Sequence, residues 1–137
     1  MSAILLDTCA AIYIVEDEWM RPSAVEAIDE AYDLGESVFV SPITAWEIGK
    51  LASRGRFKSR YSAQRWWSLL TGRPQIAVAD LPAHVLLESS FLPGKVQGDP
   101  MDRIIAATAR EYGFTVMTRD AALLDYGRQG HLSVLAC

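Results

Sequence analysis

The feature that most constrains the fold is a set of five short, mainly apolar runs of three or four residues. They lie at residues 4–6, 38–40, 76–78, 115–117 and 132–135. Runs of this kind suit strands that are buried on both faces of a sheet. Between them lie stretches with helical character, at residues 9–18, 23–34, 42–53, 62–70, 83–91, 100–112 and 121–126. Strands that alternate with helices predict an α/β fold, in which right-handed crossovers build a parallel sheet covered on both sides.

The length of the chain favours one domain over residues 1–137. Half of its 137 residues are hydrophobic, which is enough for one core, and no repeat or linker divides the sequence. No apolar run is long enough to span a bilayer. The first residues lack the basic region of a signal peptide and reach an acid at Asp7. We therefore expect a cytoplasmic protein with no membrane association.

Cysteine and histidine offer little for catalysis or metal binding. The two cysteines, Cys9 and Cys137, cannot form a disulfide framework or a cysteine metal site, so we expect free thiols. His84 and His131 lie inside or beside predicted core elements and are interpreted as packing or surface residues. A nucleophile elbow, a phosphate-binding loop and a dinucleotide fingerprint are all missing from the sequence.

Charge is distributed unevenly along a chain whose formal net charge is -4. Residues up to Glu36 carry nine acids and the single base Arg21. Residues 48–79 contain no acid and seven bases, namely Lys50, Arg54, Arg56, Lys58, Arg60, Arg65 and Arg73. This basic stretch is a candidate for contacts with a phosphate backbone or for docking an acidic partner. A solvated helical face is the alternative.

Several acids stand at or just after the predicted strands, where parallel sheets bind ligands. Asp7 follows the first strand and Asp120 follows the fourth, and either would also serve as the N-cap of the next helix. Glu47 lies on the second turn of the helix predicted to begin at Pro42, where it could also be a plain solvent-exposed side chain. Asp99 and Asp102 are spaced like a capping box around Pro100.

Acids that converge at one sheet edge repel one another unless a cation neutralises them. Carboxylate oxygens suit Mg²⁺ and Mn²⁺, and two such ions can assist displacement at a phosphate. The pattern therefore indicates a site for a hard divalent cation.

With these blocks in order, the sequence resembles the PIN-domain family, and within it the VapC-type toxins. The resemblance runs through nearly the whole chain, and its matching blocks are residues 5–8 (LLDT), 41–48 (SPITAWEI), 99–109 (DPMDRIIAATA) and 118–120 (TRD). It implies a three-layer α/β/α sandwich around a parallel sheet of strand order 3-2-1-4-5.

The resemblance also implies roles for individual residues. The acidic quartet of the family corresponds to Asp7, Glu47, Asp102 and Asp120, which would bind Mg²⁺ or Mn²⁺. Asp99 would be an N-cap or an outer helper. Thr8 and Thr118 correspond to polar helpers that orient metal-bound water or the first-strand carboxylate. Arg103 and Arg119 are candidates for contact with the scissile phosphate, although either could be an ordinary surface arginine.

The function implied is that of a metal-dependent endoribonuclease, the toxin of a toxin–antitoxin pair, which hydrolyses RNA phosphodiester bonds. Its expected partners are RNA, a second copy of the chain and a cognate VapB-like antitoxin protein whose basic side chain reaches the acidic site. Aromatic residues could line the antitoxin groove or stack on RNA bases, although core packing is their commoner role; they are Trp46, Trp66, Trp67 and Phe57.

Three alternatives fit less well. A phosphoacceptor signalling domain would need an acidic pair after the first strand and a lysine after the last strand. In this chain Asp80 is a possible acceptor, but Asp7 is followed by Thr8 and no lysine occurs after Lys95. A haloacid-dehalogenase-like phosphatase would need a second acid where Cys9 stands. A PIN-fold binding module without catalysis is disfavoured by the complete acidic quartet.

Overall fold

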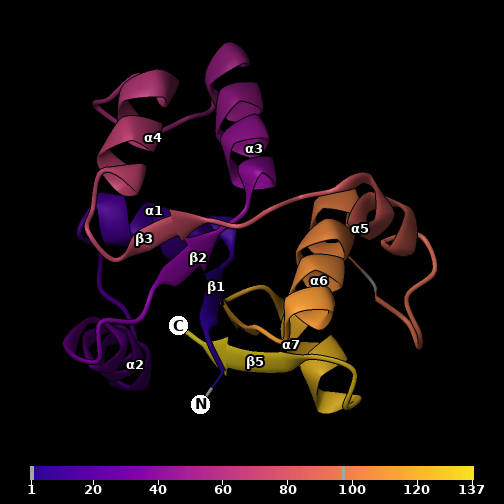
Figure 1. Cartoon of the computed structure of the whole chain (residues 1–137). Coiled ribbons are helices and arrows are strands. Elements are labelled where there is room, and N and C mark those ends of the chain that lie inside the picture. Colours follow the sequence, from indigo (N-terminus) through magenta and orange to yellow (C-terminus); the bar gives the residue numbers. More distant parts are fainter. Residues whose placement is uncertain (1, 97) are drawn as a thin grey trace.

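A five-stranded parallel sheet forms the centre of the computed structural model, which describes residues 2–96 and 98–137 (Figure 1). The strands run in the order β3-β2-β1-β4-β5, and every neighbouring pair is parallel. Their bounds are Ile4–Leu6 (β1), Val38–Val40 (β2), Ile76–Val78 (β3), Thr115–Thr118 (β4) and Ser133–Ala136 (β5). The predicted parallel α/β fold and strand order are confirmed.

Seven helices are found in the described residues: Thr8–Val15 (α1), Pro22–Asp33 (α2), Pro42–Ser53 (α3), Ala63–Thr71 (α4), Ala83–Glu88 (α5), Pro100–Tyr112 (α6) and Ala121–Arg128 (α7). Two of them end three residues earlier than predicted. α1 stops before Asp17, whose φ of 53° places it in the left-handed region that a continuing helix excludes. α5 ends at Glu88, and the hydroxyl of the next residue, Ser89, donates to the carbonyl of Leu86 at 2.6 Å.

The sheet separates two hydrophobic cores, because successive strand residues point to opposite faces. Ile4 and Leu6 belong to a core shared with α1, α2 and α4, where Trp66 is completely buried. Leu5 belongs to the other core, which α6 and α7 cover with residues such as Ile105. In Figure 1 these two groups of helices lie to the left and to the right of β1. The layers therefore form the predicted α/β/α sandwich.

Burial on both faces applies to the inner strands only. Residues of β1 and β4 are all buried, whereas those of β3 and β5 are half-buried or exposed. The expectation of buried strands was wrong for this pair, because each lies at an edge of the sheet, where neighbouring elements cover less of its surface.

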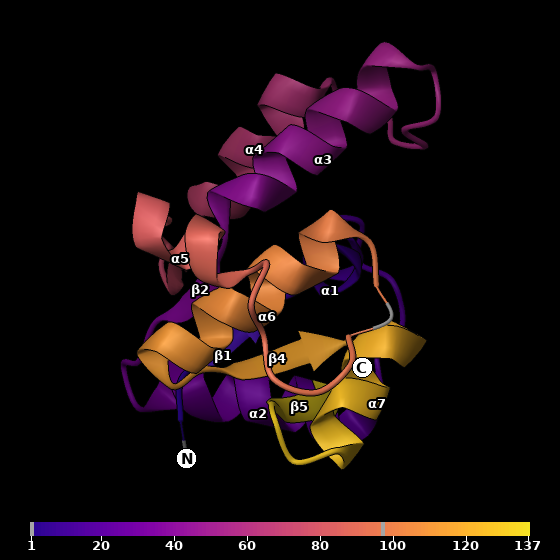
Figure 2. The same cartoon turned by 90° about the vertical axis from the view of Figure 1, so that its right-hand side faces the viewer.

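Helices α3 and α4 form a hairpin that projects from the rest of the molecule (Figure 2). α3 begins directly after β2, with the Ser41 hydroxyl accepting from the backbone N–H of Ile43 at 3.1 Å and Pro42 as the first helical residue. Phe57 packs edge-to-face on Trp66 at 5.9 Å between ring centroids and secures the connecting loop. Over the residues described, none of the helices has the length and apolar character needed to cross a membrane.

Candidate active site

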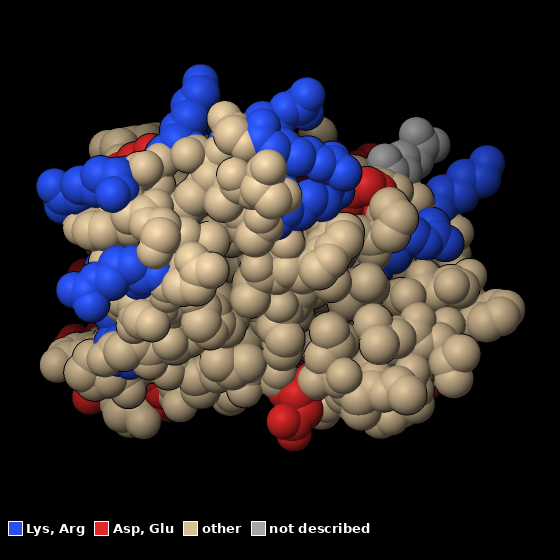
Figure 3. All heavy atoms as spheres, turned by 90° about the horizontal axis from the view of Figure 1, so that it is seen from above, with Lys and Arg blue, Asp and Glu red and all other residues tan. Residues whose placement is uncertain are grey.

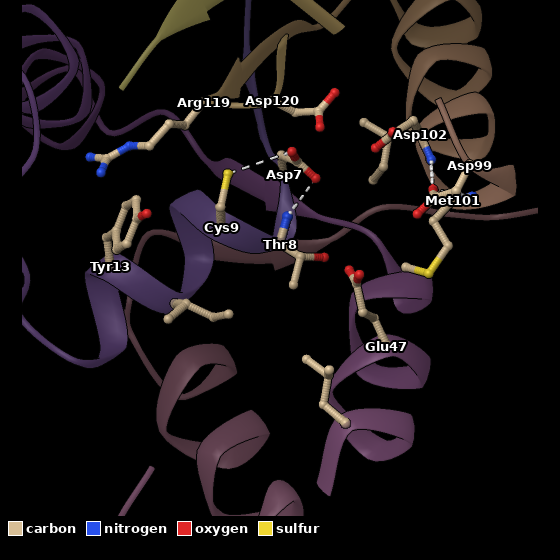
Figure 4. Close-up of a pocket in the computed structure, with 13 residues that line it drawn as sticks. Asp7, Thr8, Cys9, Tyr13, Glu47, Asp99, Met101, Asp102, Arg119 and Asp120 are labelled. Atoms are coloured by element: carbon tan, nitrogen blue, oxygen red, sulfur yellow. Dashed lines mark hydrogen bonds between the residues drawn. The ribbon is translucent and has the colours of Figure 1, made fainter. Parts of the chain in front are cut away.

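A pocket of about 400 Å³ opens where the carboxyl ends of β1 and β4 meet the N-terminal halves of α1 and α6 and the middle of α3. Figure 4 shows the acidic side chains of the pocket, which come from the end of β1, from α3, from the start of α6 and from the start of α7. All four members of the predicted quartet contribute to its wall, together with Asp99. The full lining is Asp7, Thr8, Cys9, Ile12, Tyr13, Glu47, Leu51, Asp99, Met101, Asp102, Ile105, Arg119 and Asp120.

Asp7 lies at the base of the pocket and is 8% exposed. Its Oδ1 accepts from the backbone N–H of Thr8 at 2.7 Å, and its Oδ2 accepts from the hydroxyl of Thr118 at 2.7 Å. Burial raises the pKa of Asp7, while these two hydrogen bonds oppose the increase. The carboxyl group is therefore fixed in orientation from two sides.

Asp120 is held beside Asp7 by the same threonine. The Thr118 hydroxyl accepts from the backbone N–H of Asp120 at 2.9 Å while it donates to Asp7. Oδ2 of Asp120 accepts from the N–H of Leu123 at 3.0 Å and caps α7. Thr118 is completely buried beneath the site, so it positions both acids without lining the pocket.

Asp99 and Asp102 have different tasks although both lie at the start of α6. Oδ1 of Asp99 accepts from the N–H groups of Met101 and Asp102, at 3.0 and 3.1 Å, so Asp99 is the helix N-cap. Asp102 is in the first turn, and no hydrogen bond to its carboxylate is found among the described residues. Gly98 packs against this carboxyl group so closely that a Cβ there would collide with Asp102 Oδ2.

Glu47 reaches the pocket from the second turn of α3. Burial raises its pKa, and a hydrogen bond with Thr8 and the positive charge of Lys50 oppose the increase. Thr8 also shares a 3.0 Å hydrogen bond with Thr44, which is completely buried one turn before Glu47. The contact joins the first turns of α1 and α3, and it thereby fixes Glu47 relative to Asp7.

Repulsion among the acids is visible in Asp102, whose pKa is raised to about 7. Burial is the largest cause, followed by the negative charges of Asp120, Asp99 and Asp7. A cation bound in the pocket would offset this repulsion and favour the ionised carboxylate. Asp7, Glu47, Asp102 and Asp120 are thus the side chains that could hold one.

The two arginines considered as phosphate contacts are engaged elsewhere. Arg119 lies over the ring of Tyr13 at 4.0 Å and donates to the carbonyl of Cys137 at 2.9 Å, and Figure 4 shows it pointing away from the acids. Arg103 does not line the pocket. Its guanidinium donates to the carbonyls of Ser89 and Val96, at 3.2 and 3.3 Å, and ties the loop after α5 to α6.

Cys9 is a pocket residue that sequence reasoning did not select. Its thiol donates to Asp7 Oδ2 at 3.6 Å, and a hydrogen bond with Cys137 together with burial raises its pKa. The same bond lowers the pKa of Cys137 to about 7. Both thiols are free, as predicted, but no sequence pattern indicated that residues so far apart in the chain would meet.

The remaining candidates divide between core and surface. Trp66 is buried, Trp67 and Phe57 pack partly against the same core, and Trp46 is 55% exposed. His84 is a surface residue that pairs with Glu111 at 3.1 Å, and His131 packs against Tyr126. Neither histidine reaches the pocket, and neither does Asp80, the acceptor that a phosphoacceptor domain would use.

A parallel sheet of order β3-β2-β1-β4-β5, with acids from four segments gathered at the carboxyl ends of its central strands, is the arrangement that the resemblance to PIN domains implied. The family model for the PIN domain matches residues 4–129, and the chain belongs to this family. It is 29% identical over 124 residues to Ribonuclease VapC22 of Mycobacterium tuberculosis, a match that covers 90% of this chain and 91% of that protein.

Two solved structures show the same fold. One is VapBC2 from Rickettsia felis bound to a DNA fragment from their promoter, with a TM-score of 0.68, 17% identity and 98% of each chain covered. The other is DNA-bound VapBC from Salmonella typhimurium, with a TM-score of 0.66, 22% identity and coverage of 99% of this chain and 98% of that one. These likenesses confirm the PIN-like architecture over nearly the whole chain.

Proposed function

We propose that this protein is a metal-dependent endoribonuclease that acts as the toxin of a toxin–antitoxin pair. The observation that carries the proposal is the convergence of Asp7, Glu47, Asp102 and Asp120 in one pocket of a PIN domain. The ribonuclease name of the mycobacterial relative supports RNA as the substrate.

The donor set fits Mg²⁺ or Mn²⁺, since it consists of carboxylate oxygens and lacks a nearby histidine. Within the described ranges no three acidic, histidine or cysteine side chains form a compact metal cage. Mg²⁺ does not require such a cage, since it commonly keeps several waters and takes only one or two carboxylates directly. We take Asp7 and Asp102 as the direct ligands, because two hydrogen bonds orient the Asp7 carboxylate and no hydrogen bond to the Asp102 carboxylate is found among the described residues.

When bound, the cation would activate water and stabilise negative charge on the phosphate. The chain's own residues supply the geometry. Thr118 and Thr8 hold the Asp7 carboxylate, and the Thr8–Thr44 contact holds α3, which carries Glu47. The apolar side chains of Ile12, Leu51 and Ile105 also line the pocket.

The proposed protein partner is an antitoxin of the VapB kind. The solved structures with this fold include VapBC complexes and a toxin–antitoxin complex from Klebsiella pneumoniae. A pocket with five acids would attract a basic side chain of such a partner, which would compete with the cation for the same carboxylates. Homodimer formation is proposed as well, and the exposed Leu87 and Phe91 near α5 offer apolar surface for it.

The test is cleavage of total RNA by purified, antitoxin-free protein in Mg²⁺, Mn²⁺ or EDTA. We expect discrete fragments with either metal, no fragments in EDTA, and no fragments from an Asp102→Asn preparation that controls for contaminating nuclease. Loss of cleavage on addition of a candidate VapB-like protein would support the proposed antitoxin partner. Intact RNA under all metal conditions would favour the alternative, a PIN-fold binding module without catalysis.

A further inference from the structure

The α3–α4 hairpin carries a set of basic side chains that we call the basic hairpin: Lys50, Arg54, Arg56, Lys58, Arg60 and Arg65. None of the six forms a salt bridge with any residue that the structure describes, and all except Lys50 are exposed. Figure 3 looks down on this end of the molecule, where Lys and Arg side chains project with few acids between them. These cations are available to a ligand.

The basic hairpin begins beside the acidic pocket. Glu47 and Leu51 of α3 line the pocket, and Lys50 lies between them in the sequence. The charge of Lys50 acts on the Glu47 carboxyl and opposes the burial that raises its pKa. With a rise of about 1.5 Å per helical residue, Arg54 lies roughly 10 Å beyond Glu47. One helix therefore connects the site of chemistry to the first cations of the surface.

An exposed aromatic ring lies on α3 between the acidic pocket and the basic hairpin. Trp46 precedes Glu47, is 55% exposed, and has the ammonium group of Lys50 at 4.9 Å from its ring centroid. An exposed indole next to cations is the combination that proteins use to stack the bases of single-stranded nucleic acid. Bases in a duplex are already stacked and cannot be bound in this way.

Negative charge on the rest of the molecule would repel a polyanion such as RNA. The net charge is -4, the pocket itself is acidic, and exposed acids such as Glu18, Glu26 and Asp29 occupy the side formed by α1 and α2.

Building on the nuclease function above, we propose that the basic hairpin and Trp46 bind single-stranded RNA and lead it into the pocket. Its phosphates contact the basic hairpin, and one base stacks on Trp46.

The test measures RNA binding under conditions in which the RNA is not cleaved. Fluorescein-labelled single-stranded RNA of mixed sequence is titrated with the Asp102→Asn protein in EDTA, and its anisotropy is followed at several KCl concentrations. In this background Arg56→Gln/Lys58→Gln neutralises two exposed cations of the basic hairpin. The matched control, Arg21→Gln/Arg128→Gln, removes the same charge from exposed positions outside it.

Loss of two phosphate contacts should reduce the slope of log K against log salt by about 1.4, since each contact with a single strand contributes about 0.7. The control should leave the slope unchanged. Trp46→Ala should weaken binding roughly 5- to 100-fold, whereas Trp46→Phe keeps a stacking ring and most of the affinity. Duplex RNA of the same sequence should bind more weakly and should not respond to Trp46→Ala.

Equal slopes for the basic-hairpin variant and its control would overturn the proposal. So would a variant that keeps its RNA affinity but loses affinity for poly-glutamate, because the surface would then serve an acidic protein. If the wild-type protein cleaves RNA and the Arg56→Gln/Lys58→Gln variant binds RNA normally, the basic hairpin does not bind the RNA, but the proposed nuclease function remains supported. If RNA binding depends on the basic hairpin but the wild-type protein cleaves no RNA with any metal, the proposed nuclease function is refuted, and the RNA-binding role of the basic hairpin remains supported.

Discussion

The hydroxyl of Thr118 donates to Oδ2 of Asp7 at 2.7 Å and so joins the ends of two neighbouring strands, β4 and β1. It also accepts from the backbone N–H of Asp120. One buried side chain therefore sets the relative positions of two of the four acids. Hydrogen bonding to a carboxylate favours its ionised form, and the ionised form is the one that binds a metal.

Thr118→Val should lower both stability and metal affinity. The change leaves the buried Asp7 without one donor and the Asp120 N–H without its acceptor, and each such loss typically costs about 1–3 kcal/mol. Urea unfolding measures the first effect, and the rise in Tm with added Mn²⁺ measures the second. Thr118→Ser, which keeps the hydroxyl, is the control and should retain most of both. A valine variant with wild-type stability and metal response would show that this hydrogen bond has no role in positioning Asp7.

Gly98→Ala should reduce RNA cleavage while leaving the fold intact. A Cβ at this position collides with the Asp102 carboxyl group, so that side chain must move out of its place in the pocket. Gly49→Ala is the matched control, because a Cβ there meets no atom within 4 Å and an alanine in a helix should add about 0.5–1 kcal/mol of stability. Cleavage rates of the two variants, measured alongside their circular dichroism spectra, check the expectation. Full activity of Gly98→Ala would mean that the position of Asp102 is not critical.

In metal-free buffer, stability should fall as the pH rises from about 4 to 7. The folded-state pKa of Asp102 is about 7, above its ordinary value of 3.8, so the folded protein holds a proton that the unfolded chain has released. Protons bound preferentially by the folded state make unfolding easier as pH rises. Asp7 and Glu47 have pKa values raised in the same direction and add to the trend. Urea unfolding curves recorded at several pH values would measure this fall in stability.

Asp102→Asn removes the largest of these contributions, so the variant should unfold at a higher temperature than the wild type at pH 7 and show a flatter pH dependence. Glu88→Gln alters an exposed acid outside the pocket and controls for the general loss of negative charge. If Asp102→Asn and Glu88→Gln had the same pH profile, mutual repulsion in the pocket would not limit stability.

Divalent cations should stabilise the wild-type protein and have little effect on Asp102→Asn. A ligand that binds only the folded state raises Tm in proportion to the logarithm of its concentration above Kd. Thermal unfolding at increasing Mn²⁺ concentrations, with K⁺ at equal ionic strength as the control, measures the effect. An equal rise in Tm for both proteins would place the bound cation outside the pocket.

Much of the fold and the choice of acids could be predicted because their signals are local. Ser41-Pro42 and Asp99-Pro100 mark helix starts through backbone hydrogen bonds that depend only on neighbouring residues, and both helices begin as predicted. Asp7 and Asp120 follow buried strands that pair directly, so the parallel sheet itself brings them together.

The unpredicted features depend on contacts between distant segments. The direction of a long side chain such as Arg119 is decided by the ring of Tyr13 and by carbonyl groups far away in the sequence. Arg103 likewise bonds to a loop whose path has no sequence signature. The contact between Thr44 and Thr8 depends on how α1 and α3 pack against each other, which no local pattern encodes.

Asp99 and Asp102 distinguish an acid that caps a helix from an acid of the quartet proposed to carry out RNA cleavage. They are three residues apart, yet Asp99 caps α6, while the Asp102 carboxylate lines the pocket and accepts no hydrogen bond from the residues that the structure describes. The measurement is single-turnover RNA cleavage in Mg²⁺ by Asp99→Asn and Asp102→Asn. Asparagine is also a good N-cap, so we predict that Asp99→Asn keeps most of its activity and that Asp102→Asn loses cleavage while it stays folded. Undiminished cleavage by Asp102→Asn would contradict the account.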